Sequence, residues 1–265
     1  MINGLDDYVT LEPISHRYFD KDGREYESVS RFIGRFKQPF DREMISRRTA
    51  KSRKVSQATI LAEWDKKRDN AIDHGNRIHD ALDKFDKTTI IDPENEDLRP
   101  TILAISVLFR DYYRNVSEAV LYDTESLIAG TTDKILQTTS HAKSVIDFDD
   151  YKTNLSKGIE FKSSYGNYMT GPVSHLQDCN YNHYALQLST YAYLFQKKTG
   201  RKIGMLNILF IPPHDHLHFR RIPVPYMKLE VEAMFRHRGL TDDIVNEIVD
   251  EVAEKEEFDF NEEDF

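Results

Sequence analysis

The residues of this chain that could do chemistry begin with a carboxylate two positions before a lysine, in Asp150-Tyr151-Lys152. A second acid, Asp133, lies upstream in Gly130-Thr-Thr-Asp133. Residues two apart in a strand point to the same face, so Asp150 and Lys152 are expected side by side. Carboxylates can hold Mg²⁺, and a lysine beside the ion can orient water and offset charge on a phosphate. The combination predicts metal-dependent cleavage of phosphodiester bonds.

Two further motifs lie on either side of these acids. His79 closes the run Gly75-Asn-Arg-Ile-His79 and could add a nitrogen ligand, which suits Mn²⁺ as well as Mg²⁺. Gln187 and Tyr191 are one turn apart on a predicted helix and share a face. Gln187 is expected to position Lys152 or the substrate phosphate, with Tyr191 supporting it. A half-buried helix face would show the same spacing.

The acid-rich run Asp147-Phe-Asp149-Asp150 offers three candidates for one role. Only Asp150 has the required spacing to the lysine, and Asp147 and Asp149 are expected on the opposite face of a regular strand. A bulge would reverse that choice. The predicted catalytic residues are Asp133, Asp150, Lys152, Gln187 and Tyr191. The predicted metal ligands are His79, Asp133, Asp150 and the backbone carbonyl of Tyr151.

In this order the motifs G-x-x-x-H, G-x-x-D, D-x-K and Q-x-x-x-Y resemble the PD-(D/E)XK nuclease superfamily, in its RecB-like exonuclease branch. The likeness runs from about Gly75 to Tyr193. A weaker likeness at the front, from His16 to Ser30, is similar to the opening of phage exonucleases and of the mitochondrial genome maintenance exonuclease.

The resemblance implies a restriction-endonuclease-like core, a mixed sheet flanked by helices, with a helical elaboration before it. Relatives carry a glutamate where Glu118 stands, although a solvated strand end would account for this residue equally well. The implied activity is that of a Mg²⁺- or Mn²⁺-dependent DNA exonuclease, phage-encoded and favouring single-stranded ends, that serves replication, recombination or repair. The alternatives are a structure-specific endonuclease and a non-catalytic DNA-binding or replisome-recruiting protein with a residual site.

The elements that must position these residues follow from hydrophobic periodicity and turn signals. A hairpin is expected around Asp22-Gly23, followed by a short helix from about Arg31 whose N-cap comes from the run Ser28-Val-Ser30. Further helices are predicted at 55–85, 98–113, 184–198 and 226–238, and strands at 119–122, 131–136, 144–148, 203–211 and 217–224. This alternation belongs to the α/β or α+β class.

Four regions are expected along the chain: an N-terminal hairpin at 1–27, a helical region at 28–115, the nuclease core at 116–240, and an acidic C-terminal helix and tail at 241–265. The helical region holds a basic segment whose members are expected to contact DNA phosphates: Arg42, Arg47, Arg48, Lys51, Arg53 and Lys54. Phe36, Phe40 and Trp64 could stack on unpaired bases, or they could be core aromatics of a solvated helix.

Charge is distributed unevenly along the chain. The net charge is −9, yet the last 25 residues hold 12 acids and one base, so the other 240 residues carry about +2. The tail cannot bury enough apolar surface to fold alone and is expected to be disordered in isolation. It is similar to the acidic tips of single-strand-binding proteins, which suggests a replication or recombination partner for Phe265. It could instead occupy the protein's own DNA channel, or act only as a solubilising segment.

Composition excludes several other classes. With Cys179 as the only cysteine, neither an internal disulfide nor a four-cysteine iron–sulfur cluster can form. No apolar run approaches the ~20 residues that span a bilayer, so no membrane partner is expected. The N-terminus shows no signal-peptide pattern. These features predict a cytoplasmic protein, in the host bacterial cytoplasm if it is phage-encoded.

Overall fold

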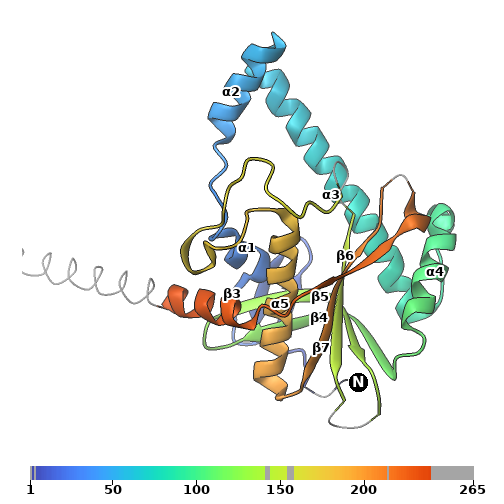
Figure 1. The fold of residues 1–265 in the computed structure, drawn as a ribbon. Helices are drawn as coiled ribbons and strands as arrows, with labels where there is room; N and C mark the ends of the chain where they lie inside the picture. The colour runs from blue at the N-terminus through green and yellow to red at the C-terminus, as the bar shows by residue number, and fades with distance from the viewer. Residues whose placement is uncertain (1, 3, 141–143, 154–157, 214, 240–265) are drawn as a thin grey trace, which may run out of the picture.

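The computed structural model of the protein describes residues 2, 4–140, 144–153, 158–213 and 215–239. A mixed sheet runs through the body, with helices on both of its faces (Figure 1). This arrangement confirms the predicted fold class and is consistent with a restriction-endonuclease-like core. The acidic tail predicted at 241–265 lies outside the described residues.

The described residues form eight strands: β1 (Val9–Glu12), β2 (Arg17–Asp20), β3 (Glu25–Ser28), β4 (Arg114–Asp123), β5 (Ile128–Gln137), β6 (Ile146–Lys152), β7 (Ile203–Phe210) and β8 (Arg220–Val224). The sheet order is β1-β2-β3-β5-β6-β7-β8, and β4 pairs with β5. The β3–β5 and β6–β7 pairs are parallel and the others are antiparallel. The predicted hairpin is confirmed as β2 and β3, and β3 joins it to the central strands.

The α-helices are α1 (Val29–Gly34), α2 (Arg42–Arg53), α3 (Gln57–Thr88), α4 (Arg99–Phe109) and α5 (Asn180–Thr199), and residues 228–239 are also helical. Within the predicted capping run, Ser28 is the N-cap of α1, and its hydroxyl accepts a hydrogen bond from the Arg31 amide at 3.2 Å. Ser56 caps α3 in the same way through the Thr59 amide. Gly200 ends α5 in a left-handed conformation.

The predicted strand at 144–148 is displaced toward the C-terminus, since β6 continues to Lys152. The apolar pattern marked this strand only as far as Phe148, because acids are uncommon in strand interiors, although the spacing of Asp150 and Lys152 already placed both in a strand. The structure resolves this conflict through specific partners for the buried carboxylates Asp149 and Asp150. Tertiary pairing therefore outweighs the local preference here.

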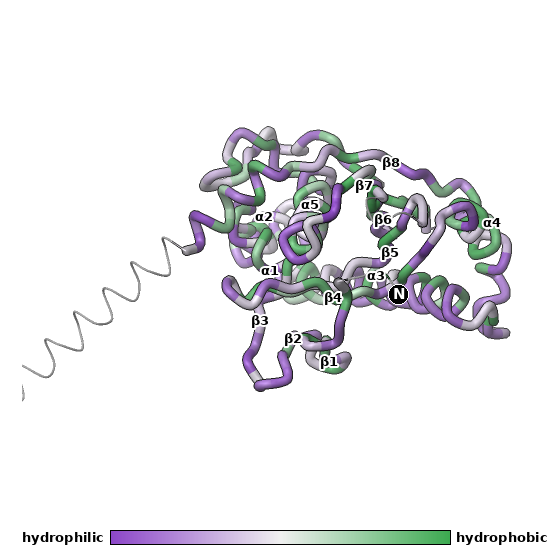
Figure 2. Tube along the Cα trace, turned by 90° about the horizontal axis from the view of Figure 1, so that it is seen from below, coloured by the Kyte–Doolittle hydropathy of each residue, from purple (hydrophilic) through white to green (hydrophobic). Residues whose placement is uncertain are grey.

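Two hydrophobic cores lie against the two faces of the sheet. Helices α1 and α5 cover one face, where Phe32, Phe148 and Phe195 are buried. Helices α3 and α4 cover the other, around Ile105 and Leu209. Hydrophobic residues dominate β7, whereas β6 alternates Ile146 and Phe148 with acids (Figure 2). In the described residues no helix is long and apolar enough to cross a membrane.

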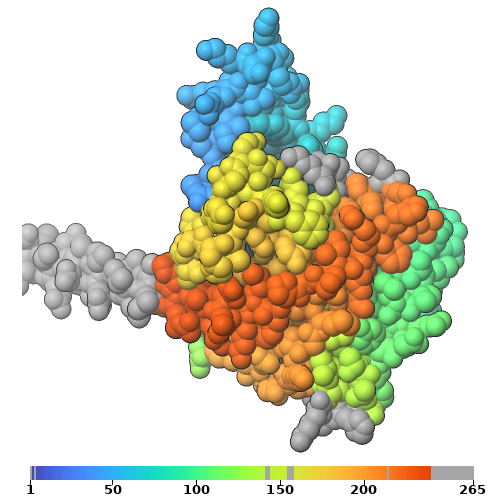
Figure 3. Space-filling model, in the orientation of Figure 1, coloured from blue at the N-terminus to red at the C-terminus, as the bar shows by residue number. Residues whose placement is uncertain are grey.

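Helix α2 and the first turns of α3 project from this body as an arm (Figures 1 and 3). The arm has a small interior of its own, where Ser46, Ala50 and Ile60 are buried and the Gln57 side chain bonds the Ser46 hydroxyl at 2.9 Å. The second half of α3 continues into the body and packs beside β4. One long helix thus joins the arm to the sheet.

Candidate active site

The site forms where the sheet forks. Strand β5 pairs with β6 from Lys134 to Gln137, and with β3 at Ile128 and Ala129. Between these stretches, residues 130–133 have no strand partner on that side within the described residues. The Tyr151 amide, which a continued ladder would have used, donates instead to the Asp133 carboxylate at 2.5 Å. The fork therefore holds Asp133 in a fixed position.

Histidine 79 reaches this fork from α3. Its Nδ1 lies 3.2 Å from Asp133 Oδ1, and its ring centroid lies 5.5 Å from that of Tyr151. One turn earlier, a Cβ on Gly75 would lie 3.2 Å from the Thr153 hydroxyl. The glycine thus lets α3 approach the end of β6 closely, which explains a residue that a helix interior normally disfavours by about 1 kcal/mol.

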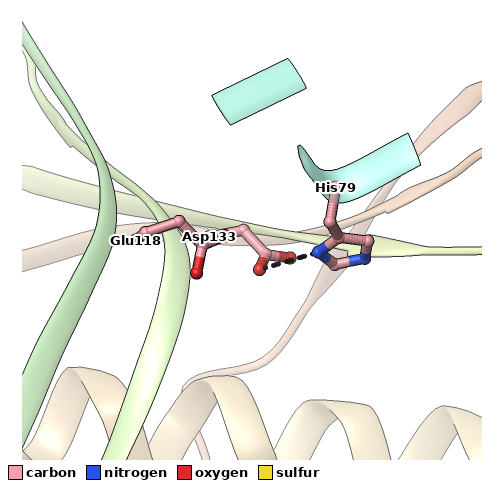
Figure 4. Close-up of side chains that lie close together, drawn as sticks. All are labelled: His79, Glu118 and Asp133. Atoms are coloured by element: carbon pink, nitrogen blue, oxygen red, sulfur yellow. Dashed lines mark ion pairs between the residues drawn. The ribbon is translucent and has the colours of Figure 1, made fainter. Parts of the chain in front are cut away.

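Glu118 completes a group with His79 and Asp133. Ser117 faces Lys134 and Ala119 faces Thr132 in the β4–β5 ladder, so Glu118 lies opposite Asp133. One ligand atom from each of the three residues lies within 4.8 Å of the others (Figure 4). Glu118 is half-buried inside β4, so the alternative of a solvated strand end is wrong. The backbone φ of Glu118 is 50°, a strained conformation of the kind that gathers at functional sites.

Sequence reasoning left the role of Glu118 open because nothing local marks it. The cross-strand pairing with Asp133 is a tertiary fact, and the positive φ cannot be read from an ordinary Ser-Glu-Ala triplet. The one available signal was the register itself: two strands joined by a short turn bring residues 118 and 133 opposite each other.

The electrostatics of the group are those of crowded carboxylates. Burial and the Asp133 carboxylate raise the pKa of Glu118 to about 8. Burial disfavours the imidazolium of His79, but Asp133 outweighs it and raises the pKa of His79 to about 9. Burial likewise opposes ionisation of Asp133, yet His79 and Lys152 hold its pKa below the usual value. A protonated His79 therefore supplies the positive charge between the acids in the metal-free protein.

Asp150 and Lys152 lie on the same face of β6, as predicted, and form an ion pair. Burial raises the pKa of Asp150 to about 6, although Lys152 works against the rise. The Lys152 ammonium is mostly buried and lies 4.9 Å from the centre of the Tyr184 ring on α5. Asp133 also acts on the pKa of both members of the pair, which places the pair beside the His79 group.

The other two acids of the run face away, which confirms the predicted register. Asp149 accepts two hydrogen bonds from Arg221 at 2.6 and 2.8 Å and a third from Asn207 at 3.0 Å. Asp147 accepts from the Met205 amide at 2.8 Å and from the Tyr112 hydroxyl at 3.1 Å. The irregularity in the β6–β7 pairing falls between Ile146 and Phe148, so it does not change the faces on which Asp149, Asp150 and Lys152 lie.

Gln187 and Tyr191 share a face of α5, as predicted, and the Gln187 amide donates to the Tyr191 hydroxyl at 2.9 Å. Tyr191 is buried against β5, where a Cβ on Gly130 would lie 2.6 Å from its ring. Tyr191 therefore packs α5 onto the fork. The role of Gln187 toward Lys152 or a phosphate, and that of the Tyr151 carbonyl toward a metal, stay predictions.

The basic segment lies on α2, in the arm. Three of its members pair with acids: Arg42 with Asp65 at 2.7 Å, Arg47 with Glu43 at 2.7 Å, and Arg53 with Glu63 at 2.5 Å. In the part of the chain that the structure describes, its other three members have no carboxylate partner: Arg48, Lys51 and Lys54. The segment thus divides into a paired and an unpaired set.

A groove of about 900 Å³ separates the arm from the segment at 160–183. Arg48 and the exposed Phe40 line it from the arm, and Lys162 and the exposed Tyr165 line it from the other side. Of the aromatics expected to stack on bases, Phe36 is a core residue, and Trp64 packs on Phe40 with ring centroids 6.0 Å apart. Phe40 is the most exposed of the three, at 64%, and so is the one that a base could reach, although its ring also contacts Trp64.

Helix α5 connects the groove with the candidate active site. His183 lines the groove, and the next residue, Tyr184, lies against the Lys152 ammonium. Four residues of helix span about 6 Å, so the groove and Gln187 are separated by one turn. That distance is close to the spacing of neighbouring phosphates in a nucleic-acid strand.

No family model matches the chain, and no curated protein matches it. Among solved structures, a protein from Eubacterium rectale with a provisional exonuclease description is similar to this chain at 14% identity and a TM-score of 0.38. The similarity covers 64% of this chain and 65% of that chain. At this level it bears on neither activity nor substrate, which are argued below from the site.

Proposed function

We propose that the protein is a divalent-metal-dependent deoxyribonuclease that hydrolyses phosphodiester bonds. The observation that supports this most directly is the convergence of His79, Glu118 and Asp133 at the fork, beside the buried Asp150–Lys152 pair. Three carboxylates crowd together here. Asp133 pairs with His79 and Asp150 pairs with Lys152, while burial and this crowding raise the pKa of the third, Glu118, to about 8. A cation would relieve that crowding.

The donor set fits Mg²⁺ or Mn²⁺. Two carboxylates and one imidazole offer oxygen and nitrogen atoms, and the described residues contain a single buried cysteine elsewhere, so a thiolate-type site does not arise. His79, Glu118 and Asp133 would hold the ion, with Asp150 beside them. When bound, the ion supplies polarisation of a phosphoryl oxygen and an activated water.

The protein's own residues would supply the rest of the chemistry. Lys152 is held by Asp150 and faced by Tyr184, so its ammonium is available to a phosphate that enters from the groove. Positive charge in a water-poor site stabilises the charge that develops on the phosphoryl oxygens. Gln187 and Tyr191 fix the α5 face opposite the fork.

We further infer that a single-stranded DNA end occupies the groove. Phe40 and Tyr165 offer exposed rings on opposite walls, and unpaired bases stack on such rings. Arg48 and Lys162 offer charge to the phosphates. His183 lines the groove and the next residue of α5, Tyr184, faces Lys152, so a strand held in the groove could deliver a terminal phosphodiester along α5 to the site. Replication, recombination and repair are the processes that produce such ends.

The test is cleavage of labelled DNA. Linear single strands, linear duplexes, closed single-stranded circles and RNA are incubated with Mg²⁺, Mn²⁺ or EDTA. We expect degradation of linear single-stranded DNA that requires the metal, and intact circles. Cleavage of circles would make the protein an endonuclease, and activity in EDTA would contradict the metal site.

Lys152→Ala and Asp133→Asn test the residues. Loss of one positive group that acts on the transition state costs about 100- to 1,000-fold in kcat. We expect a loss of at least that size in both variants, with the circular dichroism spectrum retained. Lys197→Ala is the matched control for Lys152, since Lys197 pairs with Asp123 at 2.8 Å away from the fork. A fully active Lys152→Ala protein would contradict the role proposed for Lys152 in cleavage.

A further inference from the structure

The three candidate ligands come from three different elements, and no covalent connection near the site fixes their spacing. His79 belongs to α3, Glu118 to β4 and Asp133 to β5. A metal or catalytic constellation must be held to within about 0.5 Å of its working geometry by supporting contacts. The ion pair between His79 and Asp133 cannot provide this support, because a bound cation would replace it.

A buried lysine next to Asp133 ties the same three elements together. The Lys134 side chain is fully buried, and its ammonium forms an ion pair with Asp86 of α3. It also donates to Ser117 of β4 at 2.8 Å and to Asn115 at 3.1 Å. The Ser117 hydroxyl in turn donates to Asp86 at 2.8 Å. All three protons of the ammonium thus have acceptors on the neighbouring elements.

Each candidate ligand has a close neighbour in this Lys134 cluster. Lys134 follows Asp133, and Ser117 precedes Glu118. Asp86 lies seven residues after His79, which is two helical turns along the same face of α3. Adjacent strand residues point to opposite faces, so Lys134 points away from the Asp133 carboxylate, toward α3 and the Phe109 ring at 5.3 Å. The Lys134 cluster therefore lies on the other side of β5 from the Asp133 carboxylate.

We propose that Lys134 is a positioning residue, which sets the distances among His79, Glu118 and Asp133 by holding α3 against β4 and β5. This inference rests on the proposed function, because it gives the cluster a role in metal binding. Stability alone does not call for a lysine here, since well-packed apolar side chains in place of a buried ion pair are often neutral or stabilising. An apolar residue could not make the directional contacts with Asp86, Asn115 and Ser117 that Lys134 makes.

The experiment measures Mn²⁺ binding to the full-length protein without DNA, by electron paramagnetic resonance. Supporting contacts of this kind change metal affinity by about 10- to 100-fold when they are removed. We expect Lys134→Met to weaken Mn²⁺ binding by at least the lower figure. Its activity should be low at limiting Mn²⁺ and recover at excess Mn²⁺, while the KM for DNA stays unchanged. A residue that only supports the fold would lower the melting temperature without this metal-dependent recovery.

Two further variants keep the test decisive. Ser117→Ala removes one arm of the cluster and is mild enough to fold if Lys134→Met does not, so it should still weaken Mn²⁺ binding measurably. Lys197→Met removes a comparable lysine–carboxylate pair at the far end of β4 and should leave the Mn²⁺ constant unchanged. Normal Mn²⁺ affinity in the folded cluster variants would overturn this inference alone. Absence of Mn²⁺ binding by the unaltered protein would overturn the proposed function as well.

Discussion

Proton occupancy at three residues controls the site in the metal-free protein. The folded protein raises the pKa of Glu118 from 4.5 to about 8, that of His79 from 6.5 to about 9, and that of Asp150 from 3.8 to about 6. A group with a raised pKa stabilises the fold fully below its ordinary value and loses that contribution as pH rises through the folded value. These groups therefore weaken the metal-free fold progressively between about pH 4 and pH 9. Asp133, with a lowered pKa, works in the opposite direction.

Metal binding should therefore stabilise the protein more at alkaline pH. The ion must displace protons from His79 and Glu118, and each displaced proton lowers its affinity by about tenfold per pH unit of acidification. We expect Mn²⁺ to raise the melting temperature clearly at about pH 8.5 and only slightly at about pH 6. Differential scanning fluorimetry with and without Mn²⁺ measures both shifts.

His79→Gln provides the control for this pH effect. It removes one proton and one ligand together, so the Mn²⁺-induced shift should become small at both pH values. Equal shifts at the two pH values in the unaltered protein would contradict the assignment of His79 and Glu118 as the protonated ligands.

The pairing of strands explains how much of the site could be predicted. The two-residue period of a strand was enough to select Asp150 over Asp149. The structure agrees, since Asp149 accepts a hydrogen bond from Arg221 and Asp147 accepts one from Tyr112 on the other face. The fork itself could not be foreseen, since it depends on β3 joining β5 from more than 90 residues away along the chain. Glu118 was left undecided for the same reason. Local periodicity predicts the face of the sheet on which a residue lies. The pairing of distant strands determines which residues it contacts there.

Close packing at the fork gives a prediction for Gly130. A Cβ at this position would lie 2.6 Å from the Tyr191 ring and 2.9 Å from Val29, so Gly130→Ala must displace α5 or α1. Overpacking of this kind costs about 1–3 kcal/mol. We expect a loss of that size in urea unfolding and a fall in kcat, because Tyr191 carries Gln187 with it.

Gly34→Ala is the matched substitution, since nothing lies within 4 Å of its Cβ position. It should be neutral or slightly stabilising, by less than about 1 kcal/mol. If Gly130→Ala proved as stable as Gly34→Ala, the close contact between α5 and the fork would be incorrect.

At the scale of the whole molecule, the residues proposed to bind DNA lie apart from the residues proposed to cleave it. The arm carries the unpaired cations, and the groove lies between the arm and the segment at 160–183. The path proposed for the DNA strand runs from this groove along α5 to the fork. Sequence periodicity located the long helix α3, but it did not assign α2 as a helix, and the pairing of Arg42 and Arg53 with acids required the packing of α2 on α3. The net charge of about +2 over the first 240 residues fits a basic segment in which half of the cations are neutralised by acids.

Replacing Arg48, Lys51 and Lys54 with alanine should weaken DNA binding more than replacing Arg42, Arg47 and Arg53. Each phosphate contact that is lost lowers the log–log salt slope by about 0.7–0.9, so the unpaired set should lower it by about 2. The paired set should change it less, because each of its cations is already neutralised by an acid. Fluorescence anisotropy over a series of salt concentrations measures both. Equal changes in the two triple variants would contradict the division.

The acidic tail gives the last prediction, and it concerns the same electrostatic balance. Residues 256–265 lie outside the described structure, but their sequence places six acids and three phenylalanines on the same chain as the basic arm. A tethered segment competes with DNA at a high effective concentration, and its charge acts over about 30 Å at 0.01 M salt but only about 10 Å at 0.1 M. We expect deletion of residues 256–265 to tighten DNA binding and speed cleavage at low salt, and the difference to vanish as salt rises. A tail that instead docks on a replication or recombination partner would leave both measurements unchanged and cost the protein that partner in a pull-down. If neither changed, the tail would serve solubility alone, and the competition proposed here would be wrong.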